Sequence, residues 1–430
     1  MNKRRQFSYA MAPKLLQCWN RELTKARYSG VYMKRPMRIL LCCCVAIATL
    51  AAKQPLVVVS VDGLDNRYLI NADQMGLKIP NLRRLMREGQ VSSGIIGVVP
   101  TITWPSHTTM ITGVDPLKHG ILANWRPPGE KYLDYSQIKV PTLIGAAHAA
   151  GLTIATINWP VTVDAPVDWN IPEYFSKRRG GAQDRRTVES KAKPADLFEK
   201  IAAAYPSFPQ EWMDDRNRTQ AAMYLLQHEK PGLFLIHLAD LDAEEHDNAP
   251  YTRESKAIVE RSDELIGQIL SVLPAGSALA VVSDHGFERV NTTVDLASMA
   301  KQQGITSLIQ GGGIVVAPDE RAAEFLRQTA KDSRYGIGRE IGKEELAKFP
   351  SSLPPNPAAA FEPADGFMFS PSPKGEVFSH PEEIGNHSHW PMRYRAVFIL
   401  WGKSIPQETL PEFSMKEIAG KLARVIGVSF

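Results

Sequence analysis

Three short apolar runs with a common ending constrain the fold of this chain more than any other feature. The runs are LVVVSVDG (56–63), LFLIHLADLD (233–242) and ALAVVSDHG (278–286). Runs that are apolar at nearly every position are typical of strands buried on both faces, as in parallel sheets covered by helices. Amphipathic patterns between them predict helices over 81–89, 142–151, 216–229 and 255–270. This alternation predicts a doubly wound α/β domain with a mainly parallel sheet flanked by helices.

Each apolar run closes on an aspartate, namely Asp62, Asp242 and Asp284. A single aspartate after a strand is commonly a helix cap or a turn residue. The carboxyl ends of parallel strands, however, meet at one edge of the sheet, where α/β proteins bind their ligands. Three carboxylates at that edge repel one another unless a positive charge lies between them. The three endings therefore predict a cation site.

Histidines accompany these aspartates. His246 follows Asp242 by four residues, which places both on one face of a helical turn, and His285 directly follows Asp284. The segment GNHSHW offers His387 or His389, and spacing alone does not choose between them. Oxygen and nitrogen donors in this number suit two divalent metal ions, with Zn²⁺ as the most natural occupant. Paired metals bind the attacking and leaving oxygens of a displacement at phosphorus, so we expect phosphoryl chemistry.

The segment MKRPMRILLCCCVAIATLAAKQP (33–55) has a basic lead, an apolar run and small residues at its end, a pattern typical of a signal peptide. The apolar run is short for crossing a bilayer. We expect residues 1–52 to be a leader with the true start at Met33, cleaved on export to the periplasm or the medium, with no stable membrane insertion afterwards. A retained N-terminal membrane anchor is the alternative.

Charge and cysteine content also depend on this leader. Residues 1–52 carry a net charge of +9 against +4 for the whole chain, which leaves −5 for the remainder. The sequence therefore gives no support for binding to a nucleic-acid scaffold. All four cysteines lie in the leader. We expect the exported chain to have no disulfide and no thiolate metal ligand.

Two regions interrupt the alternation of strands and helices. Residues 171–195 are polar and charged and predict a surface excursion or lid. Residues 309–385 begin with a glycine run and end rich in proline, which predicts a smaller inserted subdomain. The catalytic α/β domain would then comprise residues 53–308 and 386–430, with RYRAVFILWG (393–402) returning to the main sheet.

The segment VVPTITWPSHTTMITG (98–113) contains several hydroxyl side chains, any of which is a candidate nucleophile. Ser106 beside His107 first suggests a hydrolase pair. The ordered segments VDG, PTITWPSH, TGVDPLKHGI, DLDAEEH, SDHG and GNH, however, resemble the nucleotide pyrophosphatase/phosphodiesterase family of the alkaline phosphatase superfamily over nearly the whole chain after the leader. The resemblance implies an alkaline phosphatase-like fold and hydrolysis of phosphodiester or pyrophosphate bonds in small molecules, through a phosphothreonine intermediate.

The resemblance also implies roles for individual residues. It implies one Zn²⁺ held by Asp242, His246 and His387, and a second held by Asp62, Thr103, Asp284 and His285. Thr103 would be the nucleophile, since metal coordination generates an alkoxide at neutral pH. Asn124 and the Trp104 N–H would stabilise phosphate oxygens, and the Trp104 ring would line the pocket for a base or leaving group.

Alternatives remain for the activity and for several residues. A phosphomonoesterase or phosphonate hydrolase of the same superfamily is the main alternative, and a non-catalytic zinc-dependent binding protein is another. Within the nucleophile segment and the TGVDPLKHGI segment that follows it, we expect Ser106 to be a helix N-cap, and His107 and His119 to be buried hydrogen-bonding residues. His237 is predicted to be a strand residue, and Glu244 and Glu245 would discourage highly anionic substrates.

Overall fold

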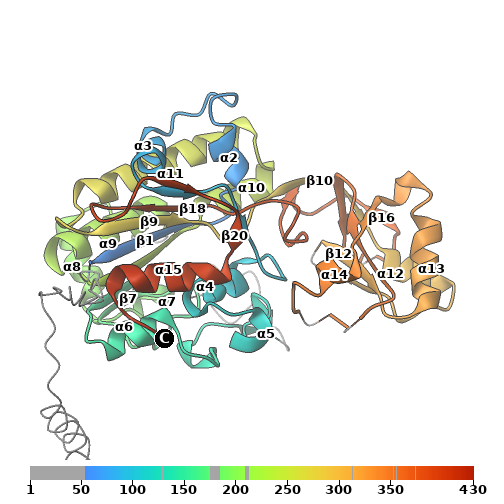
Figure 1. Cartoon of the computed structure of the whole chain (residues 1–430), viewed down its shortest axis with the longest axis horizontal. Helices are drawn as coiled ribbons and strands as arrows, with labels where there is room; N and C mark the ends of the chain where they lie inside the picture. Colours follow the sequence, from blue (N-terminus) through green and yellow to red (C-terminus); the bar gives the residue numbers. More distant parts are fainter. Residues whose placement is uncertain are drawn as a thin grey trace, which may run out of the picture. The chain divides into compact units, whose positions relative to one another are not determined.

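An eight-stranded mixed sheet forms the centre of the computed structural model (Figure 1). The structure describes residues 54–126, 130–174, 185–208, 213–311, 313–351, 353–354, 356–372 and 374–430. The predicted leader, Met33 and all four cysteines lie outside these ranges. Within them, no helix combines the length and apolar character needed to span a bilayer.

The order of strands in this sheet is β19-β2-β18-β9-β1-β8-β6-β7. Their bounds are β19 (Glu408–Leu410), β2 (Gln90–Ser92), β18 (Phe398–Trp401), β9 (Ala278–Val282), β1 (Leu56–Val61), β8 (Leu233–Leu238), β6 (Ile154–Ile157) and β7 (Trp169–Ile171). The five strands from β9 to β7 are mutually parallel, whereas β18 pairs antiparallel with β9 and β2. The predicted mainly parallel sheet is confirmed, with an antiparallel strand contributed by the segment 393–402.

Helices cover both faces of the sheet, as expected for a doubly wound domain (Figure 1). The helices of this part of the chain are α2 (Asn66–Ile70), α3 (Pro80–Glu88), α4 (Thr103–Thr112), α5 (Pro116–His119), α6 (Leu143–Ala149), α7 (Arg185–Glu189), α8 (Leu197–Ala204), α9 (Asp215–His228), α10 (Asp240–Asn248), α11 (Arg253–Ser271) and α15 (Lys416–Ile426). Side chains alternate along β1, so Val57 and Val59 pack with α3, α9 and α11, while Leu56 and Val58 pack with α4, α6 and α15.

The three central strands end at the same edge of the sheet. In the parallel register, Val61 of β1 lies opposite Leu238 of β8, and Ser60 lies opposite Val282 of β9. The predicted aspartates follow these ends within a few residues, with Asp242 on helix α10. Gly63 follows Asp62 with a φ of 73°, and a Cβ there would lie 2.8 Å from the Phe287 ring. Glycine therefore permits the tight turn that keeps Asp62 at the sheet edge.

Two smaller sheets form a second region between β9 and β18. Its elements are β10 (Glu288–Val294), α12 (Leu296–Gln302), β11 (Ile309–Gly311), β12 (Ile314–Ala317), α13 (Glu320–Thr329), β13 (Ile337–Glu340), α14 (Lys343–Leu346), β14 (Ala359–Pro363), β15 (Gly366–Phe369), β16 (Phe378–Ser379) and β17 (Gly385–Asn386). Strand β10 pairs with β15, β16 and β17, and α12 shares the apolar core of this region. Residues 288–302 thus pack with the second region, although they precede the inserted subdomain proposed for 309–385.

Packing of the central sheet predicts a large loss of stability when a buried strand residue is truncated. Leu235 on β8 is fully buried. We expect Leu235→Ala to lower the free energy of unfolding by about 2–5 kcal/mol, because it removes apolar contacts and leaves a cavity. Chemical denaturation of both proteins checks this. The matched change Leu117→Ala, at a side chain that is 47% exposed, is expected to cost less than about 1 kcal/mol, and an equal loss in both variants would contradict this account of the core.

Candidate metal centre and nucleophile

Asp62, Asp284 and His285 form a fully buried group at the ends of β1 and β9, called the inner cluster below. One oxygen of each carboxylate is held by the surrounding protein. Asp284 Oδ1 accepts from the backbone N–H groups of Gly63 and His285, both at 3.1 Å, and Asp62 Oδ2 lies 3.0 Å from His237 Nε2. The other oxygens, Asp62 Oδ1 and Asp284 Oδ2, lie 3.4 and 3.2 Å from His285 Nε2. The free donor atoms therefore converge on one point.

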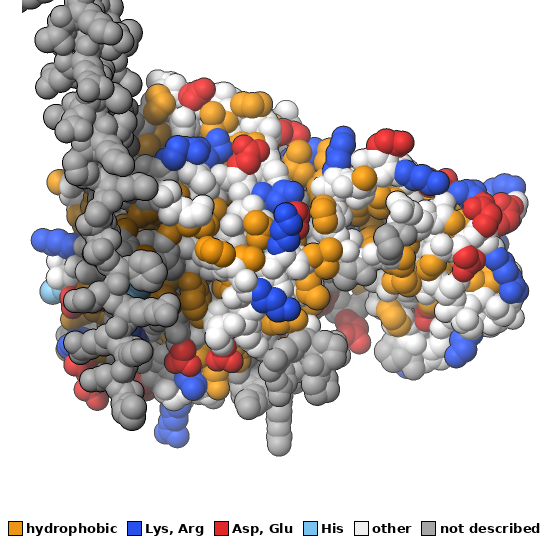
Figure 2. All heavy atoms as spheres, turned by 60° about the horizontal axis from the view of Figure 1, so that its bottom comes forward, with side chains coloured by type: hydrophobic (Ala, Val, Ile, Leu, Met, Phe, Trp, Pro, Cys, Tyr) orange, Lys and Arg blue, Asp and Glu red, His pale blue; other side chains and the backbone are white. Residues whose placement is uncertain are grey.

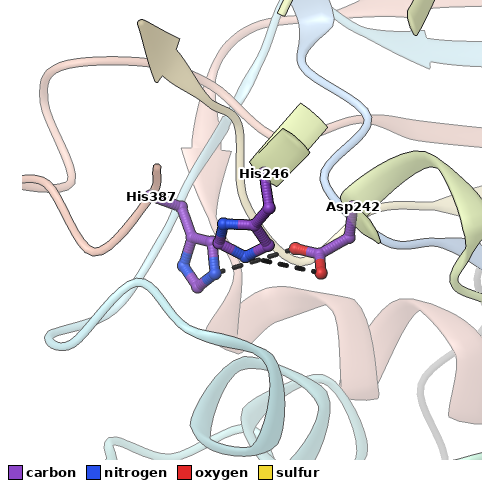
Figure 3. A group of neighbouring side chains, drawn as sticks. All are labelled: Asp242, His246 and His387. Carbon is purple, nitrogen blue, oxygen red and sulfur yellow. Dashed lines mark ion pairs between the residues drawn. The ribbon is translucent and has the colours of Figure 1, made fainter. Parts of the chain in front are cut away.

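Asp242, His246 and His387 form a second group beside the first, called the outer cluster below. Asp242 and His246 come from one face of α10, as the four-residue spacing predicted. Their side chains and His387 point toward one another in Figure 3. His246 Nε2 lies 3.6 Å from Asp242 Oδ2, and His387 Nε2 lies 3.7 Å from Asp242 Oδ1. Between His387 and His389, the structure brings His387 into this group.

The two imidazoles of the outer cluster have the same tautomer. His387 Nδ1–H donates to the Thr101 carbonyl at 3.1 Å, and His246 Nδ1–H donates to the Gly385 carbonyl at 3.1 Å with Glu383 Oε2 at 3.0 Å. A neutral imidazole that donates from Nδ1 keeps a lone pair on Nε2. In the neutral form of both residues this lone pair faces Asp242, as in histidines that ligate a metal. Because the pKa of His246 is raised to about 9, its Nε2 keeps a proton at neutral pH unless a cation displaces it.

The two clusters adjoin each other through their imidazole rings. His285 of the inner cluster stacks on His387 of the outer cluster, with ring centroids 3.9 Å apart and an interplanar angle of 14°. Burial raises the pKa of Asp62 well above its usual range, and the Asp242 and Asp284 carboxylates raise it further. Burial likewise raises the pKa of Asp284 to about 7. The charged form of each carboxylate is therefore disfavoured unless a cation neutralises it.

Histidine charge cannot supply this neutralisation throughout the site. Burial lowers the pKa values of His285 and His387 well below the usual range. Burial also lowers the pKa of His246, but the Asp242 and Glu383 carboxylates outweigh it and raise the value to about 9. Buried side-chain atoms without a hydrogen-bond partner include Asp62 Oδ1, Asp284 Oδ2, Asp242 Oδ1 and both ring nitrogens of His285. Orphaned carboxylate and imidazole atoms that face one another fit divalent cations of the kind that oxygen and nitrogen donors prefer.

Thr103 is the first residue of helix α4 and is 5% exposed. A single ring nitrogen connects it to the inner cluster, because His107 Nδ1 donates to the Thr103 carbonyl at 2.9 Å and lies 3.6 Å from Asp284 Oδ2. The prediction that Ser106 caps this helix is wrong. The N-cap is Ile102, and the Ser106 N–H already donates to the Ile102 carbonyl at 3.1 Å. Pro105 allows the earlier start because the first turn of a helix does not need its N–H groups.

Asn124 lies beside the start of α4, where its Oδ1 accepts from the Trp104 N–H at 3.0 Å. The predicted phosphate donors Trp104 and Asn124 are thus together, but the amide N–H of Trp104 is directed to the asparagine. The Trp104 indole is 4% exposed, donates to the Tyr132 carbonyl at 2.7 Å and packs with Ile121 and Val161. This packing leaves little of the ring for stacking on a substrate.

The remaining predicted histidines lie behind the two clusters. His107 Nε2 accepts from the Ser60 hydroxyl at 2.9 Å, and the His107 ring contacts His237 with ring centroids 4.3 Å apart. His237 is a residue of β8, as predicted, and its Nδ1 lies 3.0 Å from the Asn158 carbonyl oxygen. His119 is buried, and its Nδ1 accepts a hydrogen bond from the Ile121 N–H at 3.2 Å. His119 Nε2 lies 3.1 Å from Thr109 Oγ1.

Sequence reasoning missed the residues that hold the metal-ligand candidates in place. Glu383 contacts His246, the Thr101 carbonyl orients His387, and Asp215 accepts from the Ala239 and Asp240 N–H groups at the start of α10. Glu244 and Glu245 were predicted to add charge beside the metals. Glu245 is instead buried against Tyr68, whose hydroxyl donates to Glu245 Oε1 at 2.6 Å. The only sequence signal for Glu383 was its position four residues before His387.

The buried carboxylate and imidazole clusters at the carboxyl edge of a mainly parallel sheet make this chain an α/β protein with two candidate metal-binding groups. The sequence profile of the type I phosphodiesterase / nucleotide pyrophosphatase family matches residues 56–344. The chain belongs to this family.

Individual relatives agree with this assignment. The chain is 24% identical to mouse ectonucleotide pyrophosphatase/phosphodiesterase family member 1 over 251 residues, which is 55% of this chain and 24% of the relative. It is 23% identical to venom phosphodiesterase CdcPDE of Crotalus durissus collilineatus over 254 residues, 56% of this chain and 27% of that protein. The chain thus spans about a quarter of the length of these curated relatives.

Solved structures share the fold. Murine ectonucleotide pyrophosphatase / phosphodiesterase 5 superposes with a TM-score of 0.60 at 17% identity, covering 87% of this chain and 96% of the other. Phosphonoacetate hydrolase from Sinorhizobium meliloti 1021 gives a TM-score of 0.61 at 17% identity with the same coverage. The predicted alkaline phosphatase-like architecture is confirmed.

The contact between Glu383 and His246 predicts an effect on metal affinity. We expect Glu383→Gln to weaken Zn²⁺ binding by about tenfold, the low end for loss of a carboxylate behind a ligating histidine, because the Glu383 side chain is 49% exposed. Titration calorimetry with Zn²⁺ measures the change. The adjacent exposed residue supplies the control, since Glu382→Gln should bind Zn²⁺ with the affinity of the wild-type protein. Equal Zn²⁺ affinities in the two variants would show that Glu383 does not support metal binding.

Burial of His119 predicts a dependence of stability on pH. Burial lowers the pKa of His119 to about 4, so the folded state releases a proton that the unfolded state keeps below about pH 6.5. This contribution is complete above pH 6.5 and is lost as the pH falls toward 4, on the order of 2–3 kcal/mol. We expect His119→Gln, which can keep both hydrogen bonds, to lose less stability over this range in urea denaturation. The exposed control His148→Gln should follow wild type, and parallel pH profiles for all three proteins would contradict the prediction.

Proposed function

We propose that this protein is a metal-dependent phosphodiesterase or nucleotide pyrophosphatase that hydrolyses phosphodiester or pyrophosphate bonds through a phosphothreonine intermediate on Thr103. The observation that carries the proposal is the convergence of the inner and outer clusters beside the start of α4. These clusters offer only oxygen and nitrogen donors, several of them buried and without a hydrogen-bond partner. Membership in a family named for this activity supports the reaction class.

Two divalent metal ions, with Zn²⁺ as the best fit, would be held by the two clusters. Asp242, His246 and His387 would bind one ion, and Asp62, Asp284, His285 and the Thr103 hydroxyl would bind the other. Bound there, the ions would lower the pKa of a coordinated hydroxyl and stabilise negative charge on the attacking and leaving oxygens. Imidazole and carboxylate ligands suit Zn²⁺, and the Nδ1–H bonds of His246 and His387 orient their Nε2 atoms for it.

The residues of this chain perform two displacements at phosphorus. Thr103 Oγ1 loses its proton and forms a bond to phosphorus, while the bond to the leaving oxygen breaks and that oxygen takes up a proton. Water then attacks the same phosphorus, and the bond to Thr103 Oγ1 breaks, which restores the hydroxyl. Since Asn124 Oδ1 is occupied by the Trp104 N–H, the Nδ2 group is the end of the amide that donates to a non-bridging phosphate oxygen.

The substrate class follows from the relatives and from the charges around the site. Curated relatives are named for nucleotide pyrophosphatase and phosphodiesterase activity, and murine protein 5 was solved with AMP in an inactive threonine-to-alanine form. A small-molecule phosphodiester or nucleotide is therefore the proposed substrate. On the face in Figure 2, acidic and basic side chains are interspersed. Export, proposed from the leader, would place the enzyme outside the cytoplasm.

Hydrolysis of a phosphonate or a phosphomonoester is the second candidate. The structural likeness to phosphonoacetate hydrolase, solved in complex with phosphonoformate, is the observation that favours it. A panel of bis-p-nitrophenyl phosphate, p-nitrophenyl phosphate and phosphonoacetate separates the two candidates by kcat/KM. Preference for the diester supports the proposal, whereas preference for the monoester or the phosphonate replaces it. Hydrolysis of none of them by the zinc-loaded protein would favour a non-catalytic zinc-binding protein.

Replacement of Thr103 tests the nucleophile. We expect Thr103→Ala to lower kcat/KM for bis-p-nitrophenyl phosphate by at least about a thousandfold, because no other group would attack phosphorus, and Thr103→Ser to retain part of the activity. Stopped assays on zinc-loaded proteins of equal metal content provide the measurement. Ser106→Ala, three residues along the same helix, is the control and should stay within about twofold of wild type.

Two results would reject this mechanism. Diesterase activity that survives Thr103→Ala but is lost in Ser106→Ala would indicate that Ser106 is the nucleophile, with His107 as its base. Activity that persists after complete removal of metal by a chelator would show that the reaction does not need metal ions at the two clusters.

A further inference from the structure

A cavity of about 230 Å³ lies between the segment that leads into Thr103 and the strands of the second region. One wall consists of Val99, Pro100 and Leu122. The opposite wall includes Ile309 of β11, together with Ile314 and Val316 of β12. This space is called the aliphatic groove below.

The aliphatic groove is lined by residues that lie close in the chain to the proposed phosphate site. Pro100 precedes Thr103 by three residues, which corresponds to at most about 11 Å of chain. Leu122 precedes Asn124 by two residues. Thr101, next to Pro100, is fixed to the outer cluster because its carbonyl accepts from His387 Nδ1 at 3.1 Å and its hydroxyl donates to the His389 carbonyl at 2.6 Å. An extended alkyl substituent on a phosphate at Thr103 spans a distance of this order.

The walls of the groove carry no charged side chain among the described residues. Its amide side chain is already engaged, since Gln310 Nε2 donates to Asp295 Oδ1 at 3.0 Å and Gln310 Oε1 accepts from the Ala297 N–H at 2.9 Å. The wall also has no aromatic ring for stacking on a nucleobase. Ser351 contributes one hydroxyl, and the other lining side chains apart from Gln310 are aliphatic or absent. Such a surface has no cation to recognise a further phosphate, but it gains free energy when it covers an alkyl chain.

Exposed apolar side chains concentrate around this groove. In the described part of the chain, eight large hydrophobic residues are exposed, and three of them line the groove or the neighbouring cavity of about 300 Å³. These are Leu122 at 37%, Ile309 at 41% and Leu117 at 47% exposure. Single exposed apolar residues are ordinary, but a cluster beside a candidate active site marks a surface that a ligand covers.

We infer that the substrate is a phosphodiester with an uncharged aliphatic substituent, and that the aliphatic groove binds this substituent. The inference rests on the proposed function, because it places the scissile phosphate at Thr103. Burial of the chain against Leu122 and Ile309 would add binding energy at a distance from the reacting atoms. The inference assigns a role in substrate specificity to strands β11 and β12 of the second region.

A series of alkyl p-nitrophenyl phosphate diesters, from ethyl to octyl, tests the inference on the full zinc-loaded chain. We expect kcat/KM to rise about two- to fourfold for each added methylene until the groove is filled. These chains are short enough to be assayed as monomers, so the rise reports the groove and not a micelle surface. Release of p-nitrophenolate gives the rate for every ester.

Ile309→Asn is the corresponding variant, and Ile70→Asn at a side chain that is 66% exposed on α2 is its matched control. We expect Ile309→Asn to lower the ratio of octyl to ethyl kcat/KM by about fivefold, and Ile70→Asn to leave the ratio as in wild type.

The outcomes separate the inference from the proposed function. No hydrolysis of any ester, ethyl included, would reject the phosphodiesterase proposal itself. If the wild-type protein hydrolyses the ethyl ester but kcat/KM does not depend on chain length, the inferred role of the groove is wrong and the phosphodiesterase proposal stands. This outcome does not depend on whether the variant folds. A kcat/KM for thymidine 5′-(p-nitrophenyl phosphate) well above that of the octyl ester would also overturn it and favour a nucleotide.

Discussion

Repulsion among Asp62, Asp242 and Asp284 is the constraint on which the rest of this site depends. Strand ends and the start of α10 hold the three carboxylates at one edge of the sheet, where burial and their mutual repulsion disfavour the charged forms. Because these residues follow strands packed on both faces, the backbone cannot move them apart without disrupting the core. Protonation of the carboxylates relieves this repulsion in the absence of metal, and cations of the proposed kind would relieve it while the carboxylates stay charged.

A layer of neutral side chains behind the carboxylates gives the site its geometry. His237 holds one oxygen of Asp62, His107 connects Thr103 with Asp284, and the Thr101 carbonyl fixes the tautomer of His387. Burial lowers the pKa of His107 to about 3, which keeps this ring neutral beside the proposed cations. The same layer joins α4, β8 and the loop before β18. The nucleophile candidate and the ligand candidates are therefore positioned by one hydrogen-bonded unit instead of by separate loops.

The strands, the aspartates and the pair on α10 were predictable from sequence because they depend on local periodicity and on the rule that parallel strands end together. The choice of His387 over His389 was not, because both occupy one loop and only tertiary contact with Asp242 separates them. The prediction of Ser106 as the N-cap of α4 was wrong, because serine is a common cap residue but the helix already begins at Thr103. Glu383 and residues 288–302 were missed because their contacts arise when β10 pairs with β15, β16 and β17, partners distant in the chain.

The two sides of the site follow different physical rules, and this difference bears on how such a protein is specific. The metal side consists of buried polar groups whose positions are fixed by the sheet, so a change there costs both charge balance and packing. The aliphatic groove is bordered by Ile309 on β11, which pairs only with β12 in its sheet and is partly exposed. Residues of that kind change size with little effect on the core. Under the proposed function, the sheet edge would determine the class of reaction, while the second region would be free to determine which phosphoryl compound reaches it.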